Sequence, residues 1–384
     1  MKEIIKDLDA LSRGRVKELK DAKNAGSCII EYTGNFVPEE VIRAAKAEPW
    51  IMCRGGEPEP PDAVLDTMLR FMNPMSRTIA GNIKLDLDPV TPIADLIVTG
   101  QTDCHIGRIT ELLEFEKYPI AKVGVPADWT KDIALEYYTK SLRLMVEKIE
   151  KLTGNKVTTE ELNHQFELSN KVNELLNKIS DLRKKDNPPI GFSDFIKLNH
   201  YSYKVKPEIM IEKLEKLYEE LKDAPGIFED DSPRILLAGR AVAIGDYIAP
   251  NLVENVGGCI VADFLDEGIR TYRHTVDITD DPIAAYAKSR MRDCEPIDVF
   301  QPAWDIRYKF MKKLIEDFKV DGVIWYQLSF DEIYDMECTC LAKNFKEDKI
   351  PMMKLETSYE YTRESMGPLT TRIESYVEQL KGAK

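Results

Sequence analysis

Cysteine is the residue type in this chain with the widest chemical range, and the sequence contains seven. They are Cys28, Cys53, Cys104, Cys259, Cys294, Cys338 and Cys340. No CxxC pair occurs, so the zinc-ribbon and ferredoxin-type sites built on such pairs are not predicted. The nearest two, Cys338 and Cys340, would point to nearly opposite faces of a helix. The odd number and long spacing do not suit a disulfide framework, and each thiol can simply be a small buried side chain.

One of these cysteines lies in a loop that could do chemistry. The loop QTDCHIGR (residues 101–108) follows a predicted strand at residues 94–100 and leads into a predicted helix. Ligands of open α/β sheets bind past the carboxyl ends of the strands. Cys104 would lie at the helix N-terminus, where backbone N–H groups favour a thiolate and lower the thiol pKa. Cys104 is therefore predicted as a metal ligand or nucleophile, with packing at the strand-to-helix corner as the alternative.

A second loop of interest follows a predicted apolar strand at residues 322–328. It reads SFDEIYDMEC (residues 329–338), and its acidic residues begin a predicted helix. Ser329, Asp331 and Glu337 are predicted as catalytic residues. For Glu332 and Asp335 we favour the ordinary role of acidic charge at a helix N-terminus. We expect this loop and Cys104 to face each other in a cleft between two domains.

A third loop, MCRGGEPEPP (residues 52–61), follows a short predicted strand at residues 50–53. Gly55 and Gly56 would let the backbone approach a ligand closely. Arg54 could bind a phosphate. All three are predicted to bind substrate, although a turn without a function would explain the pattern equally well.

The elements that position these loops alternate between strand and helix. Further strands are predicted at residues 27–32, 120–125, 234–239, 259–264 and 350–355, and helices at residues 38–46, 62–71, 104–115, 246–256, 301–318, 331–345 and 371–380. Residues 132–185 and 208–223 instead have long amphipathic helical patterns. We predict an α/β fold with two Rossmann-like or flavodoxin-like domains, mainly parallel sheets and a helical insertion. The predicted boundaries are 1–130, 131–230 and 231–384.

Composition and absent motifs exclude several functions. A net charge of −14 and a pI near 5.0 argue against binding to nucleic acids or anionic membranes. No apolar run is long enough to span a bilayer, and the first residues do not resemble a signal peptide, so a cytoplasmic protein is predicted. The chain has no GxGxxG, GxxxxGK[ST], GxSxG or HExxH motif, which weakens dinucleotide, NTPase, serine-hydrolase and zinc-protease interpretations.

Four stretches together resemble one enzyme family. VDGVIWYQLSFDEIYDMEC, followed by IPMMKLETSYEY and TRIE at residues 371–374, is similar to the C-terminal part of the 2-hydroxyacyl-CoA dehydratase and benzoyl-CoA reductase family. EYTGNFVPEEVIRAA, ADLIVTGQTDCHIGR and PRILLAGRAVAIGDY resemble its earlier segments, in the same order. The likeness covers nearly the whole chain and is closest to the D-component subunits of the dehydratases.

This resemblance implies a specific chemistry. The family implies an oxygen-sensitive [4Fe–4S] cluster bound by three cysteines, a heterodimer of related subunits, and an ATP-dependent iron–sulfur activator that supplies one electron. An acyl-CoA substrate then reacts through a ketyl radical, by loss of water in the dehydratases or by ring reduction in the reductases. Such chemistry needs a low-potential cluster in a dry pocket.

The sequence departs from the family at two of the three ligand positions. Cys104 matches the middle ligand, but Asn73 and Asp331 stand where the family has cysteine. Substitute sets are Cys53, Cys104 and Cys338, or Cys53, Cys104 and Cys294. Asn73 is predicted to contact substrate.

Three functions are compatible with these residues. The first is a radical acyl-CoA dehydratase or reductase subunit that binds a cluster. The second is a cluster-free partner subunit, and the third is a small-molecule reductase of the double-cubane type. The sequence does not identify the acyl group or decide between a homodimer and a heterodimer.

Overall fold

The N-terminal part of the chain forms a four-stranded parallel sheet. The computed structural model describes residues 1–296 and 303–383. Strands β1 (Ile29–Thr33), β2 (Glu48–Ile51), β3 (Leu96–Gln101) and β4 (Ile120–Gly124) pair in the order β2-β1-β3-β4. The connecting elements are α2 (Glu39–Ala44), α3 (Glu59–Ala63), α4 (Pro74–Lys84), the 3₁₀ turn η1 (Thr91–Ile93) and α5 (Cys104–Phe115). Strands β1 to β3 are almost entirely buried, as expected where helices cover both faces of a parallel sheet.

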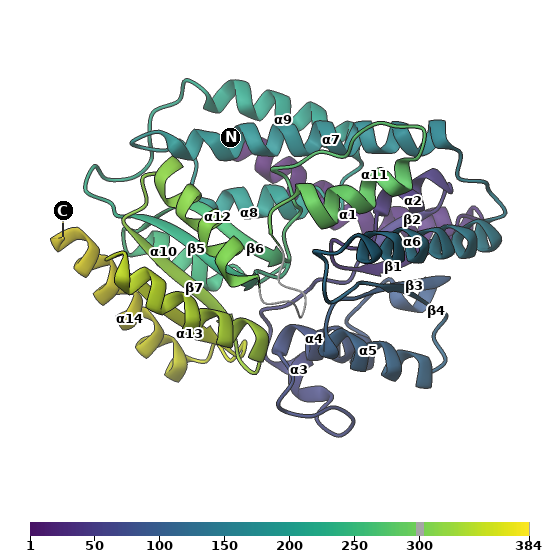
Figure 1. The fold of residues 1–384 in the computed structure, drawn as a ribbon, viewed down its shortest axis with the longest axis horizontal. Helices are drawn as coiled ribbons and strands as arrows, with labels where there is room; N and C mark the ends of the chain where they lie inside the picture. Colours follow the sequence, from purple (N-terminus) through teal and green to yellow (C-terminus); the bar gives the residue numbers. More distant parts are fainter. Residues whose placement is uncertain (297–302, 384) are drawn as a thin grey trace.

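The C-terminal part repeats this plan. Strands β5 (Arg234–Ala241), β6 (Cys259–Glu267), β7 (Gly322–Leu328) and β8 (Met352–Thr357) are parallel, in the order β6-β5-β7-β8. The helices of this part of the chain are α10 (Ile248–Asn255), α11 (Pro282–Lys288), η3 (Ser289–Asp293), α12 (Trp304–Asp317), α13 (Glu332–Glu347) and α14 (Arg363–Gly382), of which α11 contacts α6 and α7. In Figure 1 this sheet lies on the left and the first sheet on the right, and α14 forms the left edge.

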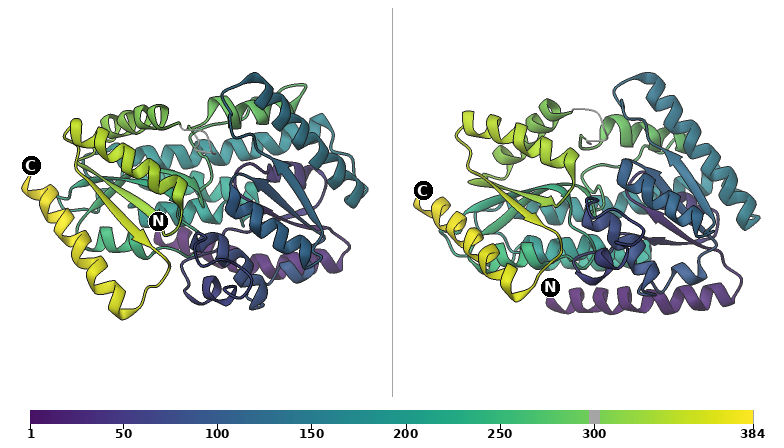
Figure 2. Two further views of the ribbon diagram at one scale, coloured as in Figure 1. Left: turned by 60° about the horizontal axis from the view of Figure 1, so that its bottom comes forward. Right: turned by 90° about the horizontal axis from the view of Figure 1, so that it is seen from below.

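Helices from the middle of the chain pack across both sheets. They are α6 (Asp132–Thr153), α7 (Thr159–Asp181), η2 (Leu182–Lys184), α8 (Phe192–Tyr201) and α9 (Pro207–Leu221). The N-terminal helix α1 (Lys2–Asn24) contacts α8 and α9 and runs along the lower edge of the molecule in the right view of Figure 2. One buried apolar cluster includes residues of both sheets and of these helices. The two sheets are therefore fixed relative to each other by a shared core.

The predicted α/β class with two mainly parallel sheets is confirmed. Helix α5 begins and ends where it was predicted, and so does strand β7. Helix α12 lies within the predicted residues 301–318, of which 301 and 302 are outside the described residues. The predicted domain boundaries stay a prediction. No helix in the described ranges combines the length and apolar character that crossing a membrane requires.

The helix predicted at residues 62–71 is wrong. Helix α3 ends at Ala63, and turns follow it. The Pro61 carbonyl accepts a hydrogen bond from the Arg77 guanidinium at 2.9 Å, and the Leu65 amide, which would donate to it in a helix, donates to the Asp62 carbonyl instead. Leu69 and Phe71 are 72% and 67% exposed. The apolar spacing therefore came from turns that bury Val64 and Met68 and leave Leu69 and Phe71 exposed.

Candidate functional site

A buried arginine joins the carboxyl ends of strands from both sheets. Arg240 is on β5, and its guanidinium binds Asp331 at 2.8 Å and Glu267 at 3.2 Å. It also binds Asp103, which follows β3 and caps α5 by accepting a hydrogen bond from the Ile106 amide at 2.9 Å. We call Arg240, Asp103, Glu267 and Asp331 the Arg240 cluster. It lies at the strand ends where ligands of α/β sheets bind.

The two positions at which cysteine was expected contact each other. Asn73 donates a hydrogen bond from its side-chain amide to the Asp331 carboxylate at 3.3 Å. The other end of the Asn73 side chain caps α4 by accepting from the Ser76 amide at 2.8 Å. Both residues are buried. The loops that were predicted to carry the first and last cluster ligands therefore meet, but through an amide and a carboxyl group.

An aromatic pair also joins the loops that carry Asn73 and Asp331. Phe71 and Phe330 lie edge to face with their ring centroids 5.5 Å apart. Phe330 has φ at +62°, a left-handed conformation that is unfavourable for a bulky side chain. The loop before α13 therefore holds a strained conformation in which Phe330 contacts the Phe71 loop and Asp331 points inward.

The Arg240 cluster contains three carboxyl groups and one guanidinium. Burial and the nearby Asp103 raise the pKa of Asp331, and Arg240 offsets this only in part. Burial likewise raises the pKa of Glu267. For Asp103, burial opposes ionisation, but Arg240 and the Ile106 amide outweigh burial and lower the pKa. The cluster therefore favours one charged carboxylate and two carboxyl groups that retain protons more readily than usual.

Cys104 lies beside this cluster, at the first position of α5, and its side chain is exposed. The prediction of a lowered thiol pKa is wrong. Partial burial and the negative charges of Asp103 and Glu332 raise the pKa of Cys104, and they outweigh the backbone amide at the helix start. The acidic cap residue that begins this helix thus opposes the thiolate that the helix would favour.

The other predicted ligands do not join Cys104 in one thiol site. Cys53 is buried two residues past β2 and lines a narrow cavity with Glu267, and burial and the charge of Glu267 raise its thiol pKa to about 12. Cys338 packs in the apolar cluster between α13 and the second sheet, and Cys294 donates from its sulfur to the Arg290 carbonyl at 3.2 Å. Within residues 1–296 and 303–383, no three His, Cys, Asp or Glu side chains are grouped so that they could bind a metal ion. Neither substitute cysteine set is assembled.

These contacts decide whether the site fits a [4Fe–4S] cluster. Such a cluster is bound by thiolates, but Cys104 and Cys53, the predicted ligands that follow β3 and β2, both have a raised thiol pKa. The positions of the other two ligands are filled by Asn73 and Asp331, which are hydrogen-bonded to each other, and Asp331 is also bound to Arg240. The residues present do not fit the cluster.

Two predicted catalytic residues lie outside the Arg240 cluster. Glu337 is buried on α13 and binds the Arg307 guanidinium at 2.6 Å. Arg307 also binds Asp266 at 2.9 Å, and the ring of Tyr334 lies between Arg240 and Arg307. Ser329 is half-buried, and its backbone amide donates to the Thr357 carbonyl at 2.9 Å. Their catalytic roles stay predictions.

Gly55 and Gly56 of the third loop pack closely against another segment of the chain. The amide of Gly55 donates to the Ile244 carbonyl at 3.1 Å, in the segment that follows β5. A Cβ on Gly55 would lie 2.8 Å from the Ala243 side chain, and one on Gly56, whose φ is +89°, would lie 2.8 Å from Asp246. The glycines therefore let two segments of the chain approach closely, and Arg54 pairs with Glu57 at 2.6 Å.

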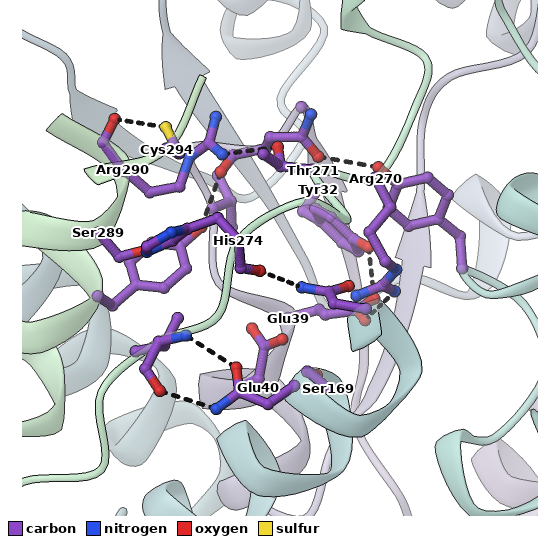
Figure 3. A pocket seen from close by; sticks show the side chains of 18 residues that line it. Tyr32, Glu39, Glu40, Ser169, Arg270, Thr271, His274, Ser289, Arg290 and Cys294 are labelled. Carbon is purple, nitrogen blue, oxygen red and sulfur yellow. Dashed lines mark hydrogen bonds and ion pairs between the residues drawn. The ribbon is translucent and has the colours of Figure 1, made fainter. Parts of the chain in front are cut away.

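A second buried group of charges lies around Glu39 (Figure 3). The Glu39 carboxylate accepts from Arg270 at 2.6 Å, from Arg43 at 2.8 Å and from the Tyr32 hydroxyl at 2.6 Å. Although burial opposes ionisation, these partners lower the pKa of Glu39 to about 2. We call these four residues the Glu39 cluster. Glu39, Tyr32 and Arg270 line a cavity of about 70 Å³, and Cys294 lines it as well.

Sequence reasoning missed Arg240, Asp103 and Glu267. Arg240 could have been noticed, because it is a charged residue in a strand, RILLAGRA, that is otherwise suited to complete burial. Such a residue needs a buried partner. The sequence does not show which carboxylates pair with Arg240, because that depends on how the ends of β3 and β7 and the start of α13 pack around β5.

Comparison with known proteins identifies the family. A model of the 2-hydroxyglutaryl-CoA dehydratase D-component family matches residues 35–380, and the chain belongs to this family. The putative dehydratase subunit YjiM of Escherichia coli K12 is 22% identical over 94% of this chain and 93% of its own length. The (R)-phenyllactyl-CoA dehydratase beta subunit of Clostridium sporogenes is 24% identical over 70% of each chain. A benzoyl-CoA reductase subunit of Thauera aromatica is 21% identical over 98% of this chain and 96% of its own.

Proposed function

We propose that this chain is the cluster-free partner subunit of an oxygen-sensitive acyl-CoA dehydratase or aromatic acyl-CoA reductase. It would pair with a related subunit that carries the [4Fe–4S] cluster and receives the electron from an ATP-dependent activator. This chain would complete the wall of the substrate pocket and form part of the activator's docking surface. The relatives support a subunit role, since their names describe subunits of dehydratases and reductases.

The observation that carries this proposal is the Arg240 cluster. A guanidinium bound to Asp331 at 2.8 Å and to Asp103 occupies the strand ends beside Cys104. A [4Fe–4S] cluster bound at that point would displace the buried ion pairs and leave the Arg240 guanidinium without its carboxylates. Burying an unpaired charge in this way is costly. Arg240 therefore compensates the aspartate that replaces one cysteine, and the asparagine that replaces the other donates a hydrogen bond to that aspartate.

Iron and acid-labile sulfide analysis tests the proposal. The chain would be purified and kept without oxygen, and Cys104→Ser would be prepared in parallel. We expect wild type and variant to contain the same low background of iron and sulfide. Stoichiometric iron and sulfide in wild type, lost in Cys104→Ser, would overturn the proposal and favour the cluster-bearing enzyme or a double-cubane type reductase.

A further inference from the structure

A separate cavity opens between α1, the end of β2 and the segments that follow α4 and α8. Its volume is about 360 Å³, within the range of small-molecule sites. Much of its wall is apolar, with contributions from Trp50, Ile79, Leu87 and Ile244. The right view of Figure 2 shows α1, which supplies one wall, along the lower edge of the molecule.

The cationic residues of this wall differ in whether they are paired. Arg13 binds Asp9 at 2.6 Å, and Arg54 binds Glu57 at the same distance. Lys204 is the lysine of the wall, and in the part of the chain that the structure describes it forms no ion pair or side-chain hydrogen bond. Its ammonium lies 5.0 Å from the centre of the Trp50 ring.

The ammonium of Lys204 also faces the cavity. The charges that act on it most belong to Arg54, Asp88, Cys53 and Asp9, all of which line the cavity. Burial and the positive charge of Arg54 lower the pKa of Lys204. An anion seated in the cavity would offset the positive charge of Arg54 and stabilise the charged form of Lys204.

A second polar group points to a ligand. Asn82 is 3% exposed and lines the cavity, and its Oδ1 has no hydrogen-bond partner among the described residues. A buried carbonyl without a donor costs stability unless something satisfies it. The Asp88 carboxylate, which also lines the cavity, differs from Asn82 because it already accepts a hydrogen bond from the Val90 amide at 2.9 Å.

We propose that this cavity binds an organic anion, with its carboxylate or phosphate on Lys204, an apolar body against Trp50, and a hydroxyl or amide donor on Asn82. The site is distinct from the Arg240 cluster, and the proposal is independent of whether the chain binds iron. Ile51, Met52, Cys53 and Ile79 line both this cavity and a narrower one that reaches Thr102 and Glu267. A longer ligand would extend toward the Arg240 cluster.

Binding of matched probes to the full chain tests the site. 4-Hydroxyphenylacetate carries the anion, the ring and the donor, and 4-hydroxyphenylacetamide is its uncharged counterpart. By calorimetry or ligand-observed NMR we expect the acid to bind wild type and the amide to bind roughly tenfold more weakly or not at all. Phenylacetate compared with phenyl phosphate then shows which anion the site prefers, and either preference supports an anion site.

Variants locate the binding. Lys204→Met should weaken binding of 4-hydroxyphenylacetate by roughly tenfold or more. Lys206→Met is the matched control, because Lys206 is exposed and outside this cavity; it should bind like wild type. Equal binding of acid and amide, no binding of the acid at about 10 mM, or unchanged binding in Lys204→Met would each overturn the proposal. The amide comparison needs no variant, so the test survives a folding defect.

Discussion

The Arg240 and Glu39 clusters both join distant parts of the chain through buried charges, but their balance is opposite. Glu39 is one carboxylate with two guanidinium partners, from Arg43 and Arg270. Arg240 is one guanidinium with three carboxyl partners. The Glu39 and Asp331 carboxyl groups are both buried, so the difference between their pKa values comes from the number of charged partners. Two guanidinium groups lower the pKa of Glu39 to about 2, whereas Asp331 shares one guanidinium with two other acids and its pKa is raised.

This comparison separates a stabilising contact from a candidate site. The Glu39 cluster satisfies its carboxylate completely and has the character of a structural ion pair. The Arg240 cluster keeps carboxyl groups whose charged forms are disfavoured, and Oδ1 of Asp331 has no hydrogen-bond partner among the described residues. Perturbed acids at the ends of parallel strands are typical of functional sites.

The largest expected effect follows removal of Arg240. We predict that Arg240→Met lowers the free energy of unfolding at neutral pH by about 3–5 kcal/mol, because three buried carboxyl groups lose their cation. The loss should shrink as the pH falls and the carboxylates become protonated. Denaturant unfolding measures both. Arg270→Met is the comparison, and its loss should be smaller, since Glu39 keeps Arg43 and Tyr32. If Arg240→Met lost no more stability than Arg270→Met, the proposed difference between the Arg240 and Glu39 clusters would be wrong.

Glu39→Gln is expected to have the next largest effect. The Glu39 pKa falls from its ordinary 4.5 to about 2, and each pKa unit corresponds to about 1.4 kcal/mol, so the substitution should cost roughly 3.5 kcal/mol at neutral pH. Because the folded-state pKa is depressed, this stabilisation is present above about pH 4.5 and is lost as the pH falls toward 2. Unfolding free energies of variant and wild type across this interval should converge, and a constant difference would count against the assignment.

Asp331→Asn should behave in the opposite way. The folded state raises the pKa of Asp331 above its ordinary 3.8, so ionisation of this carboxyl as the pH rises destabilises the fold. We predict that the asparagine variant is as stable as wild type at neutral pH or more stable by up to about 1 kcal/mol. The difference should vanish below the ordinary pKa. A clear loss of stability at neutral pH would show that the carboxylate is fully compensated.

Cys104→Ser should have the smallest effect. The side chain is exposed at the start of α5, so we predict a change in unfolding free energy within about 0.5 kcal/mol. Thermal unfolding of the anaerobic protein checks this. A much larger loss would mean that the thiol has a structural or ligand role that the contacts of the described residues do not explain.

Sequence patterns predicted the sheets well and the site only in part. The strand at Gly322–Leu328 and the helix at Cys104–Phe115 were found because apolar runs and a strand-to-helix loop are local signals. Helices α1 and α4 were not predicted. The contact between Asn73 and Asp331 joins residues far apart in the chain, and the pairing of Arg240 with three acids depends on how two sheets approach. The sign of the Cys104 pKa shift was wrong because burial and the adjacent Asp103 outweigh the helix N-terminus, with a further contribution from Glu332 on α13.

Electron paramagnetic resonance of the reconstituted chain tests the central claim most directly. The protein would be treated with iron and sulfide without oxygen, desalted and reduced with dithionite, with Cys104→Ser in parallel. We predict that neither sample shows the signal of a reduced [4Fe–4S] cluster, because Asn73 and Asp331 fill two ligand positions, Arg240 binds Asp331, and the described residues offer no group of three metal ligands. A cluster signal in wild type that is absent in Cys104→Ser would contradict this claim.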